Sequence, residues 1–146
     1  MVAREIAPAE YSAQTVLDGL YLFSNSSLAD DLTVKEFCDQ YVNALVNGKV
    51  VIQYDENDKP TGCNTYCFLT DEQASLMTTT GFWPSLEDYQ REDGDQLWVF
   101  WTVSIAGRGV QQLLNLRKWG RKMYGKRPVY FVRDIDFHQR LRRGTT

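Results

Sequence analysis

A strand, a glycine turn, a helix and a second strand are predicted in succession between residues 97 and 133, and this unit constrains the fold more than any other part of the chain. Leu97–Ile105 is aromatic and β-branched and contains no glycine or proline, which is typical of a buried strand. Val110–Tyr124 has apolar residues at spacings near 3.6, which predicts an amphipathic helix, and Pro128–Arg133 follows as a short strand. The predicted apolar stripe of the helix consists of Val110, Leu113, Leu114, Leu116, Trp119 and Met123.

The turn between the first strand and the helix is a candidate cofactor-binding site formed by Gly107, Arg108 and Gly109. Backbone N–H groups at a helix N-terminus bind an anionic phosphate or a polarised carbonyl, so the turn is a candidate site for an acyl carrier. The same residues are also ordinary strand-to-helix turn chemistry, and one Gly-x-Gly does not distinguish the two interpretations.

Charge is divided unevenly along the chain. Residues 1–107 carry 5 basic and 17 acidic side chains, whereas residues 108–146 carry 11 basic and 2 acidic side chains. The basic part predicts an acidic partner, which is a carrier protein, a nucleic acid, a membrane surface or the acidic part of another copy. The alternative is a solvated helix face that the chain's own acidic half neutralises. The candidate partner-binding residues are Arg117, Lys118, Arg121 and Lys122, which lie on one face of the predicted helix because they are paired four residues apart.

The first half of the chain predicts two helices and a hairpin. Ala7–Phe23 is expected to begin as a helix with Pro8 in its first turn, although its last four residues fit a short strand equally well. A capping box at Thr33 begins a second helix over Val34–Val46. Lys49–Tyr54 and Thr61–Leu69 are predicted to form an antiparallel hairpin around a polar turn. The apolar face expected for the first helix consists of Tyr11, Val16, Leu17 and Leu20.

The segment between the hairpin and Leu97 is less regular. A helical or irregular stretch begins at Thr70 and ends at Trp83-Pro84, and Ser85–Tyr89 is a short helical turn before an acidic turn at residues 92–95. The resulting order of elements predicts an α+β fold with a central, mostly antiparallel sheet flanked by helices, in one domain over residues 1–146. This order resembles that of N-acetyltransferase-like proteins.

Composition excludes several classes of protein. The chain is 43% hydrophobic and 24% charged, as in an ordinary globular domain, and no apolar run approaches the roughly 20 residues that span a bilayer. Glu5 and Glu10 stand where a signal peptide would be basic and then apolar, so a cytoplasmic location is expected. Three cysteines are expected to be reduced thiols, and no metal site is expected because Cys63 and Cys67 have only one histidine in the chain to join them.

Four short blocks resemble the RTX toxin-activating lysine acyltransferases, a family with an N-acetyltransferase-like fold. The blocks are the aromatic segment and serine-rich loop Leu20–Leu28, the turn Asp55–Pro60 before a strand, Leu69-Thr70-Asp71-Glu72, and Gly94-Asp95-Gln96-Leu97-Trp98. The resemblance covers about residues 15–132. It implies transfer of a fatty acyl group from the phosphopantetheine of acyl carrier protein to a lysine; acyl coenzyme A is the alternative donor for an active enzyme.

The same resemblance implies that the two catalytic side chains have been replaced. Ala29 falls at the position of the family's catalytic histidine and Trp101 at that of its aspartate, and neither can transfer a proton. Asp30 and Asp31 lie beside the first position, but a solvated carboxylate is a poor base for a lysine ammonium. The single histidine, His138, lies beyond the last predicted strand and is expected to be a surface residue.

Two functions therefore compete. The first is a catalytically degenerate relative that acts as a binding or structural module; because compact members of this family resemble small phage-encoded proteins, a phage protein of the virion or of host-directed function is one version. The second is an active acyltransferase that uses an acyl carrier and other catalytic groups, or proximity alone. A nucleic-acid partner has only the aromatic residues among the cations in its favour and no recognised motif.

Overall fold

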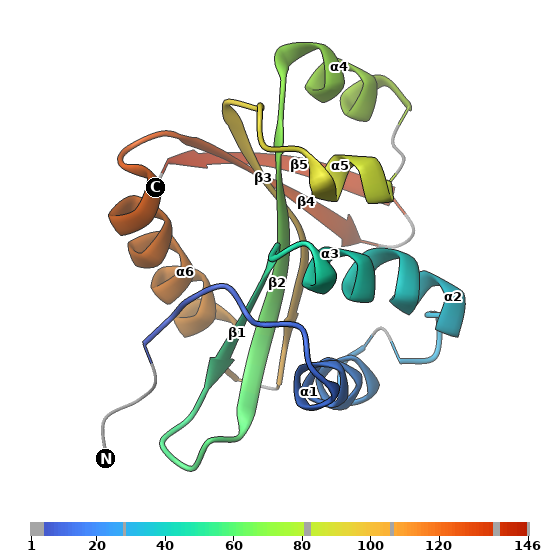
Figure 1. Ribbon diagram of the computed structural model, residues 1–146, viewed down its shortest axis with the longest axis vertical. Helices are drawn as coiled ribbons and strands as arrows, with labels where there is room; N and C mark the ends of the chain where they lie inside the picture. Colours follow the sequence, from blue (N-terminus) through green and yellow to red (C-terminus); the bar gives the residue numbers. More distant parts are fainter. Residues whose placement is uncertain (1–4, 28, 81–82, 106, 136–137, 146) are drawn as a thin grey trace.

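A five-stranded sheet in the order β1-β2-β3-β4-β5 forms the centre of the computed structural model, which describes residues 5–27, 29–80, 83–105, 107–135 and 138–145 (Figure 1). The strands are β1 (Val50–Tyr54), β2 (Pro60–Leu69), β3 (Gln96–Ser104), β4 (Pro128–Ile135) and β5 (His138–Thr145). The helices are α1 (Ala13–Ser24), α2 (Val34–Phe37), the π-helix η1 (Cys38–Val42), α3 (Asn43–Val46), α4 (Asp71–Thr80), α5 (Leu86–Gln90) and α6 (Gly109–Tyr124). None of the helices in the described ranges is both long and apolar enough to cross a membrane.

The strand pairing is mostly antiparallel, as the sequence predicts. β1 pairs with β2, β2 with β3, and β4 with β5 in antiparallel fashion, whereas β3 and β4, which α6 connects, are parallel. The predicted hairpin is therefore confirmed. β5 was not predicted, because its sequence is rich in cations and has no apolar alternation, which is a composition that edge strands tolerate.

The helices cover the two faces of the sheet separately. In Figure 1, α6 lies on one side of the sheet, and α1, α3 and α5 lie on the other. The face under α6 buries Leu97 and Val99 of β3 against Trp119, while the opposite face buries Trp98 and Phe100 with the helices from the first half of the chain. The two-residue alternation of β3 thus supplies both cores from one strand.

Helix α1 begins six residues later than the sequence predicts. Ser12 is its N-cap, with a reciprocal capping box to Thr15, whereas Pro8 forms an isolated antiparallel bridge with Val51 of β1. Placing Pro8 in the first helical turn was therefore wrong, and so was the alternative of a strand at the end of this segment, because α1 continues to Ser24. Its buried residues are Asp18, Gly19, Leu22 and Phe23, so the expected face of Tyr11, Leu17 and Leu20 is exposed.

The predicted helix over Val34–Val46 is confirmed as a continuous helical segment with a π-helical turn in its middle. The Thr33 hydroxyl accepts the N–H of Glu36, and the Glu36 carboxylate accepts the N–H of Thr33, as the capping box requires. A π-helical turn contains one residue more than a regular turn and changes which side chains face the core. Here it includes Gln40 and Tyr41, both buried.

The buried face of α6 differs from the predicted stripe. Gln112 is buried, and its side-chain nitrogen donates to the Asn64 side chain at 2.8 Å and to the carbonyls of Cys63 and Val103. A polar residue therefore takes the first core position, because it satisfies polar groups of the strands that the helix crosses. Leu116, Trp119 and Gly120 complete the buried face, and Val110, Leu113, Leu114 and Met123 of the predicted stripe are exposed.

Candidate functional site

The glycine turn lies where the sequence predicts, between the end of a central strand and the N-terminus of α6. Gly107 has φ +81°, a conformation that favours glycine, and the Arg108 N–H donates to the carbonyl of Ile105 at 3.2 Å. Gly109 begins α6, where the first N–H groups of a helix have no intrahelical acceptor. A glycine turn into a helix N-terminus is therefore present at the end of β3, and binding of a cofactor by Gly107, Arg108 and Gly109 stays a prediction.

The parallel strands β3 and β4 pair over only a short distance, at the end of β3 remote from this turn. The register joins Leu97 to Val129, Trp98 to Tyr130 and Val99 to Phe131, and it ends there although both strands continue. The second half of β3, which leads to the N-terminus of α6, therefore does not pair with β4.

A β-bulge in β3 determines what faces this position. Asn64 pairs with Thr102 and Tyr66 with Val99, so Phe100 and Trp101 both lie opposite Thr65. The bulge sends Phe100 and Trp101 to the same face of the sheet. The Trp101 N–H donates to the Thr65 hydroxyl at 3.2 Å, so this backbone group is already bonded within the protein rather than directed at a ligand.

Trp101 is part of the core. Trp101 is 7% exposed, and its ring stacks on that of Trp83 with centroids 4.7 Å apart. The ring centroid of Phe23 lies 5.8 Å from that of Trp101. Its indole N–H donates to the side-chain oxygen of Gln40 at 3.2 Å. The position that the resemblance assigns to a catalytic aspartate is therefore filled by a large side chain whose polar group is satisfied.

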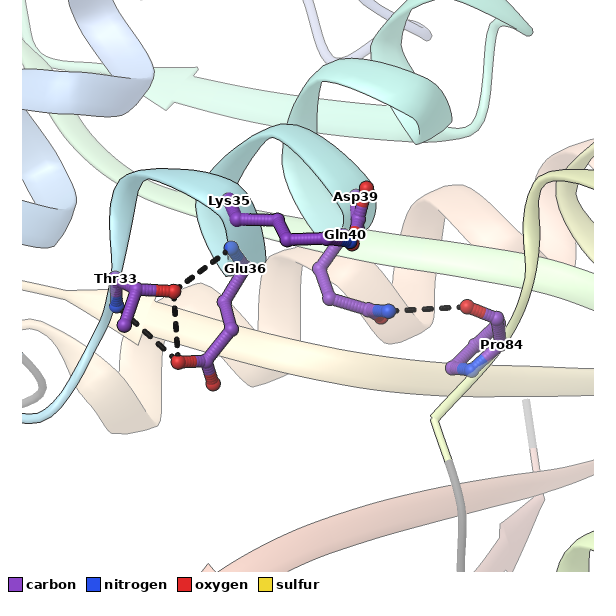
Figure 2. A network of polar contacts seen from close by, with 6 residues as sticks. All are labelled: Thr33, Lys35, Glu36, Asp39, Gln40 and Pro84. Atoms are coloured by element: carbon purple, nitrogen blue, oxygen red, sulfur yellow. Dashed lines mark hydrogen bonds and ion pairs between the residues drawn. The ribbon is translucent and has the colours of Figure 1, made fainter.

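Gln40 of the π-helix η1 hydrogen-bonds with β3 and with the segment Pro84–Tyr89 around Trp101. Its oxygen also accepts the hydroxyl of Tyr89 at 3.1 Å. Its nitrogen donates to the carbonyl of Pro84 at 3.0 Å, as Figure 2 shows. Burial raises the pKa of the Tyr89 hydroxyl above the ordinary value, so it stays a neutral donor. We did not predict the role of Gln40, although its position three residues after Phe37 on the apolar face of a helix was a usable signal.

The position that the resemblance assigns to a catalytic histidine lies in the turn after α1. Ala29 is exposed, and its N–H donates to the carbonyl of Ser26. Ser26 in turn donates through its hydroxyl to the carbonyl of Phe23, whose ring contacts Trp101. The serine-rich turn therefore follows the residue whose ring contacts Trp101, and neither Ala29 nor Trp101 carries a group that exchanges protons.

Other titratable side chains do not replace the missing pair. Asp30 and Asp31 are exposed. His138 begins β5, which corrects its predicted place beyond the last strand, and its side chain lies outside the described residues. Among the described residues, the buried charged side chains are Asp18 and Lys49. Asp18 accepts the Tyr54 hydroxyl at 2.7 Å and the side-chain amide of Gln14. Lys49 pairs with the exposed carboxylate of Glu92. These interactions join α1 and the turn before β3 to the sheet.

The cysteines divide into one exposed thiol and two buried ones. Cys38 is exposed, Cys63 and Cys67 are buried, and all three are free thiols, as expected. Burial raises the pKa of the Cys63 and Cys67 thiols, so they stay protonated and are poor nucleophiles and metal ligands. In the described part of the chain, no group of three or more histidine, cysteine, aspartate or glutamate side chains is placed to hold a metal ion.

Two of the blocks that carry the resemblance, Leu69–Glu72 and Gly94–Trp98, lie against each other at the start of β3. Gln96 donates to the carboxylate of Asp71 at 2.6 Å and accepts the indole N–H of Trp98 at 3.1 Å. A Cβ atom on Gly94 would lie 2.4 Å from the backbone nitrogen of Leu69, so only glycine fits there. These blocks therefore form a structural joint, at the opposite end of the strand from the glycine turn.

The predicted partner-binding cations lie on the exposed side of α6. Lys122 pairs with Glu5 at 2.7 Å, and this hydrogen bond raises the pKa of the lysine and lowers that of the glutamate. Within the described ranges, no acidic side chain pairs with Arg117, Lys118 or Arg121. The chain's own acidic half thus neutralises one of the four cations by direct contact.

Comparison with solved structures identifies the fold. The loading GNATL domain of CurA from Lyngbya majuscula matches with a TM-score of 0.56 and 12% identity, over 90% of this chain and 65% of that chain. The histone acetyltransferase HPA2 and related acetyltransferase from Corynebacterium glutamicum matches with a TM-score of 0.50 and 10% identity, over 92% of this chain and 78% of that chain. This chain therefore spans less than two thirds of the length of the CurA domain. Neither a family model nor a curated protein sequence matches the chain.

These likenesses define the class of fold. The chain has an N-acetyltransferase-like fold, with a glycine turn leading from a central strand into a helix and a parallel neighbour beyond it. At identities of 10–12%, the likeness shows the fold alone.

Proposed function

We propose that this chain is a catalytically degenerate acyltransferase-like domain, folded as one domain over residues 1–146, that acts as a binding or structural module. The observation that carries the proposal is the environment of Trp101, whose ring stacks on Trp83 and whose N–H is bonded to Gln40. Transfer of an acyl group to a lysine needs a group that removes the ammonium proton. At the two positions that correspond to the family's catalytic pair, this chain has an indole and a methyl group.

The relation to the RTX toxin-activating lysine acyltransferases is part of this proposal. Its support is the ring contact between Trp101 and Phe23, which precedes the serine-rich turn, and the hydrogen bond between the Asp71 and Gln96 blocks. A small phage-encoded protein, acting in the virion or on host machinery, is the concrete form that we favour. Host cytoplasm or the virion is then its location.

The alternative is an active acyltransferase, and the glycine turn is the observation that favours it. The first-turn N–H groups of α6 and the exposed Arg108 fit the phosphate of coenzyme A or of acyl carrier protein. The acyl end does not fit equally well, because the indoles of Trp101 and Trp83 occupy the space beside the bulge. When bound, such a carrier would supply a thioester, and this chain's residues would hold its phosphate without a base for the acceptor.

The partner of the module is proposed to be a protein with an acidic surface, bound by Arg117, Lys118, Arg121 and Lys122. Three of these cations have no acidic partner in the described part of the chain, and like charges four residues apart on a helix repel each other at a cost of a few tenths of a kcal/mol per pair. An external acidic surface removes that cost. Homo-oligomers are one way to provide it.

Native mass spectrometry of the purified protein, with identification of every species that copurifies, tests the proposal. We expect copies of the chain or a protein partner, and no pantetheine-bearing species. A bound acyl pantetheine, on coenzyme A or on a carrier protein, would favour the enzyme instead.

A further inference from the structure

The outer side of α6 carries an apolar row followed by a cationic row. Val110, Leu113 and Leu114 are 77%, 39% and 48% exposed, which is unusual for three neighbouring apolar side chains on one helix. The unpaired cations follow one to two turns later. We call this surface the α6 outer face; it consists of Val110, Leu113, Leu114, Arg117, Lys118 and Arg121.

A second exposed region combines an apolar row on α1 with two acidic side chains in the turn that follows the helix. On α1, Leu17, Leu20 and Tyr21 are 58%, 45% and 47% exposed, at the spacing of one helix face. The chain then passes through the serine-rich turn to the exposed Asp30 and Asp31. We call this surface the α1 outer face; it consists of Leu17, Leu20, Tyr21, Asp30 and Asp31.

We propose that the α6 outer face of one copy binds the α1 outer face of a second copy. In both surfaces the apolar row comes first and the charges follow toward the C-terminus. At 1.5 Å per residue, Arg121 lies about 12 Å along α6 from Leu113, and the end of α1 lies about 10 Å from Leu17. A parallel alignment of the two helices therefore places apolar side chains against apolar side chains and arginines near aspartates.

The position of the two faces in the fold sets the symmetry. The buried side of α6 packs on one face of the sheet and that of α1 on the other, so the two outer faces point away from each other (Figure 1). A copy therefore uses a different surface toward each of two neighbours, which is a head-to-tail contact that builds a ring or an open filament. A symmetric contact between two α6 helices would instead oppose cations to cations, which is unfavourable.

This inference deepens the proposed function and rests on it only in taking α6 as the binding surface. It is separate from the loss of catalysis, because neither outer face contains Trp101, Ala29 or the glycine turn. Detection of acyl transfer would thus refute the degenerate-enzyme proposal without affecting the assembly proposal. A monomeric protein without acyl transfer would refute the assembly proposal and agree with the degenerate-enzyme proposal.

Sedimentation velocity over a range of protein concentrations tests the assembly with paired charge reversals. The variant Arg117→Glu/Arg121→Glu and the variant Asp30→Lys/Asp31→Lys are each expected to associate at least tenfold more weakly than the wild type. An equimolar mixture of the two variants is expected to associate again, because each reversed face then meets a reversed face of the other variant. The control Arg117→Lys/Arg121→Lys keeps the charge and is expected to associate like the wild type.

The expected signature also includes weaker association with added salt, because exposed charges are screened over about 10 Å at 0.1 M. A wild-type chain that stays monomeric at all concentrations would overturn the proposal. So would association that the Asp30/Asp31 reversal leaves unchanged, or a monomer whose α6 binds vesicles of anionic phospholipid, since the α6 outer face would then serve a membrane.

Discussion

Replacing Gln40 with leucine tests whether Trp101 is held as a core residue. The change removes the acceptor shared by the Trp101 indole N–H and the Tyr89 hydroxyl. It also removes the donor to the Pro84 carbonyl, and all three groups are buried. Each buried group that loses its partner costs about 1–3 kcal/mol. Because leucine recovers part of this loss by apolar burial, we expect a net loss of about 3 kcal/mol in the free energy of unfolding.

Urea unfolding followed by circular dichroism measures this loss, with Gln90→Leu as the matched control. Gln90 is an exposed glutamine of α5, so the same substitution there is expected to cost less than about 0.5 kcal/mol. If Gln40→Leu costs no more than this control, the hydrogen bonds around Trp101 do not hold it, and the argument from its environment fails.

Three further outcomes follow from particular contacts. Gly94→Ala is expected to lower the free energy of unfolding by more than about 3 kcal/mol, because its Cβ would collide with the backbone of Leu69. Gly107→Ala has open space around its Cβ and is expected to cost about 1 kcal/mol because of its positive φ. Urea unfolding of both variants measures these losses. The backbone N–H of Lys59 donates to the Asp55 carboxylate and lowers its pKa in the folded state. This interaction stabilises the fold fully at pH values above the pKa of Asp55 in the unfolded chain. The stabilisation is lost as the pH falls through the pKa of Asp55 in the folded chain. Below about pH 4, the urea midpoint of the wild type should therefore fall more steeply than that of Asp55→Asn. An aromatic disulfide reagent should titrate Cys38 in the folded protein and the two buried thiols only after denaturation.

The sequence predicted the sheet and its supporting helices where a local pattern was unambiguous. Three local patterns each correspond to one physical requirement, and each is present in the structure. They are the aromatic and β-branched run of β3, the capping box at Thr33 and the glycine turn before α6. The start of α1 was misplaced because Pro8 is compatible with a first helical turn, and only the tertiary contact with Val51 shows that it bridges to β1 instead.

The candidate site was predictable only in part. Its glycines follow from local turn chemistry, but the bulge that turns Trp101 into the core depends on register between β2 and β3, which no local pattern specifies. The buried side of α6 was misjudged for a related reason. Gln112 is favoured over Leu113 and Leu114 by polar groups on strands remote in the sequence, and the apolar residues are displaced to the surface.

The most direct measurement of the central claim is an acyl-transfer assay of the wild type, with acyl coenzyme A and with acyl carrier protein as donors and a lysine peptide as acceptor. Mass spectrometry of the peptide would detect the product. We expect no turnover above background, because Ala29 and Trp101 occupy the two proton-handling positions. Clear turnover that survives Asp31→Ala and His138→Ala would contradict the account, because catalysis would then come from groups that it assigns to structure.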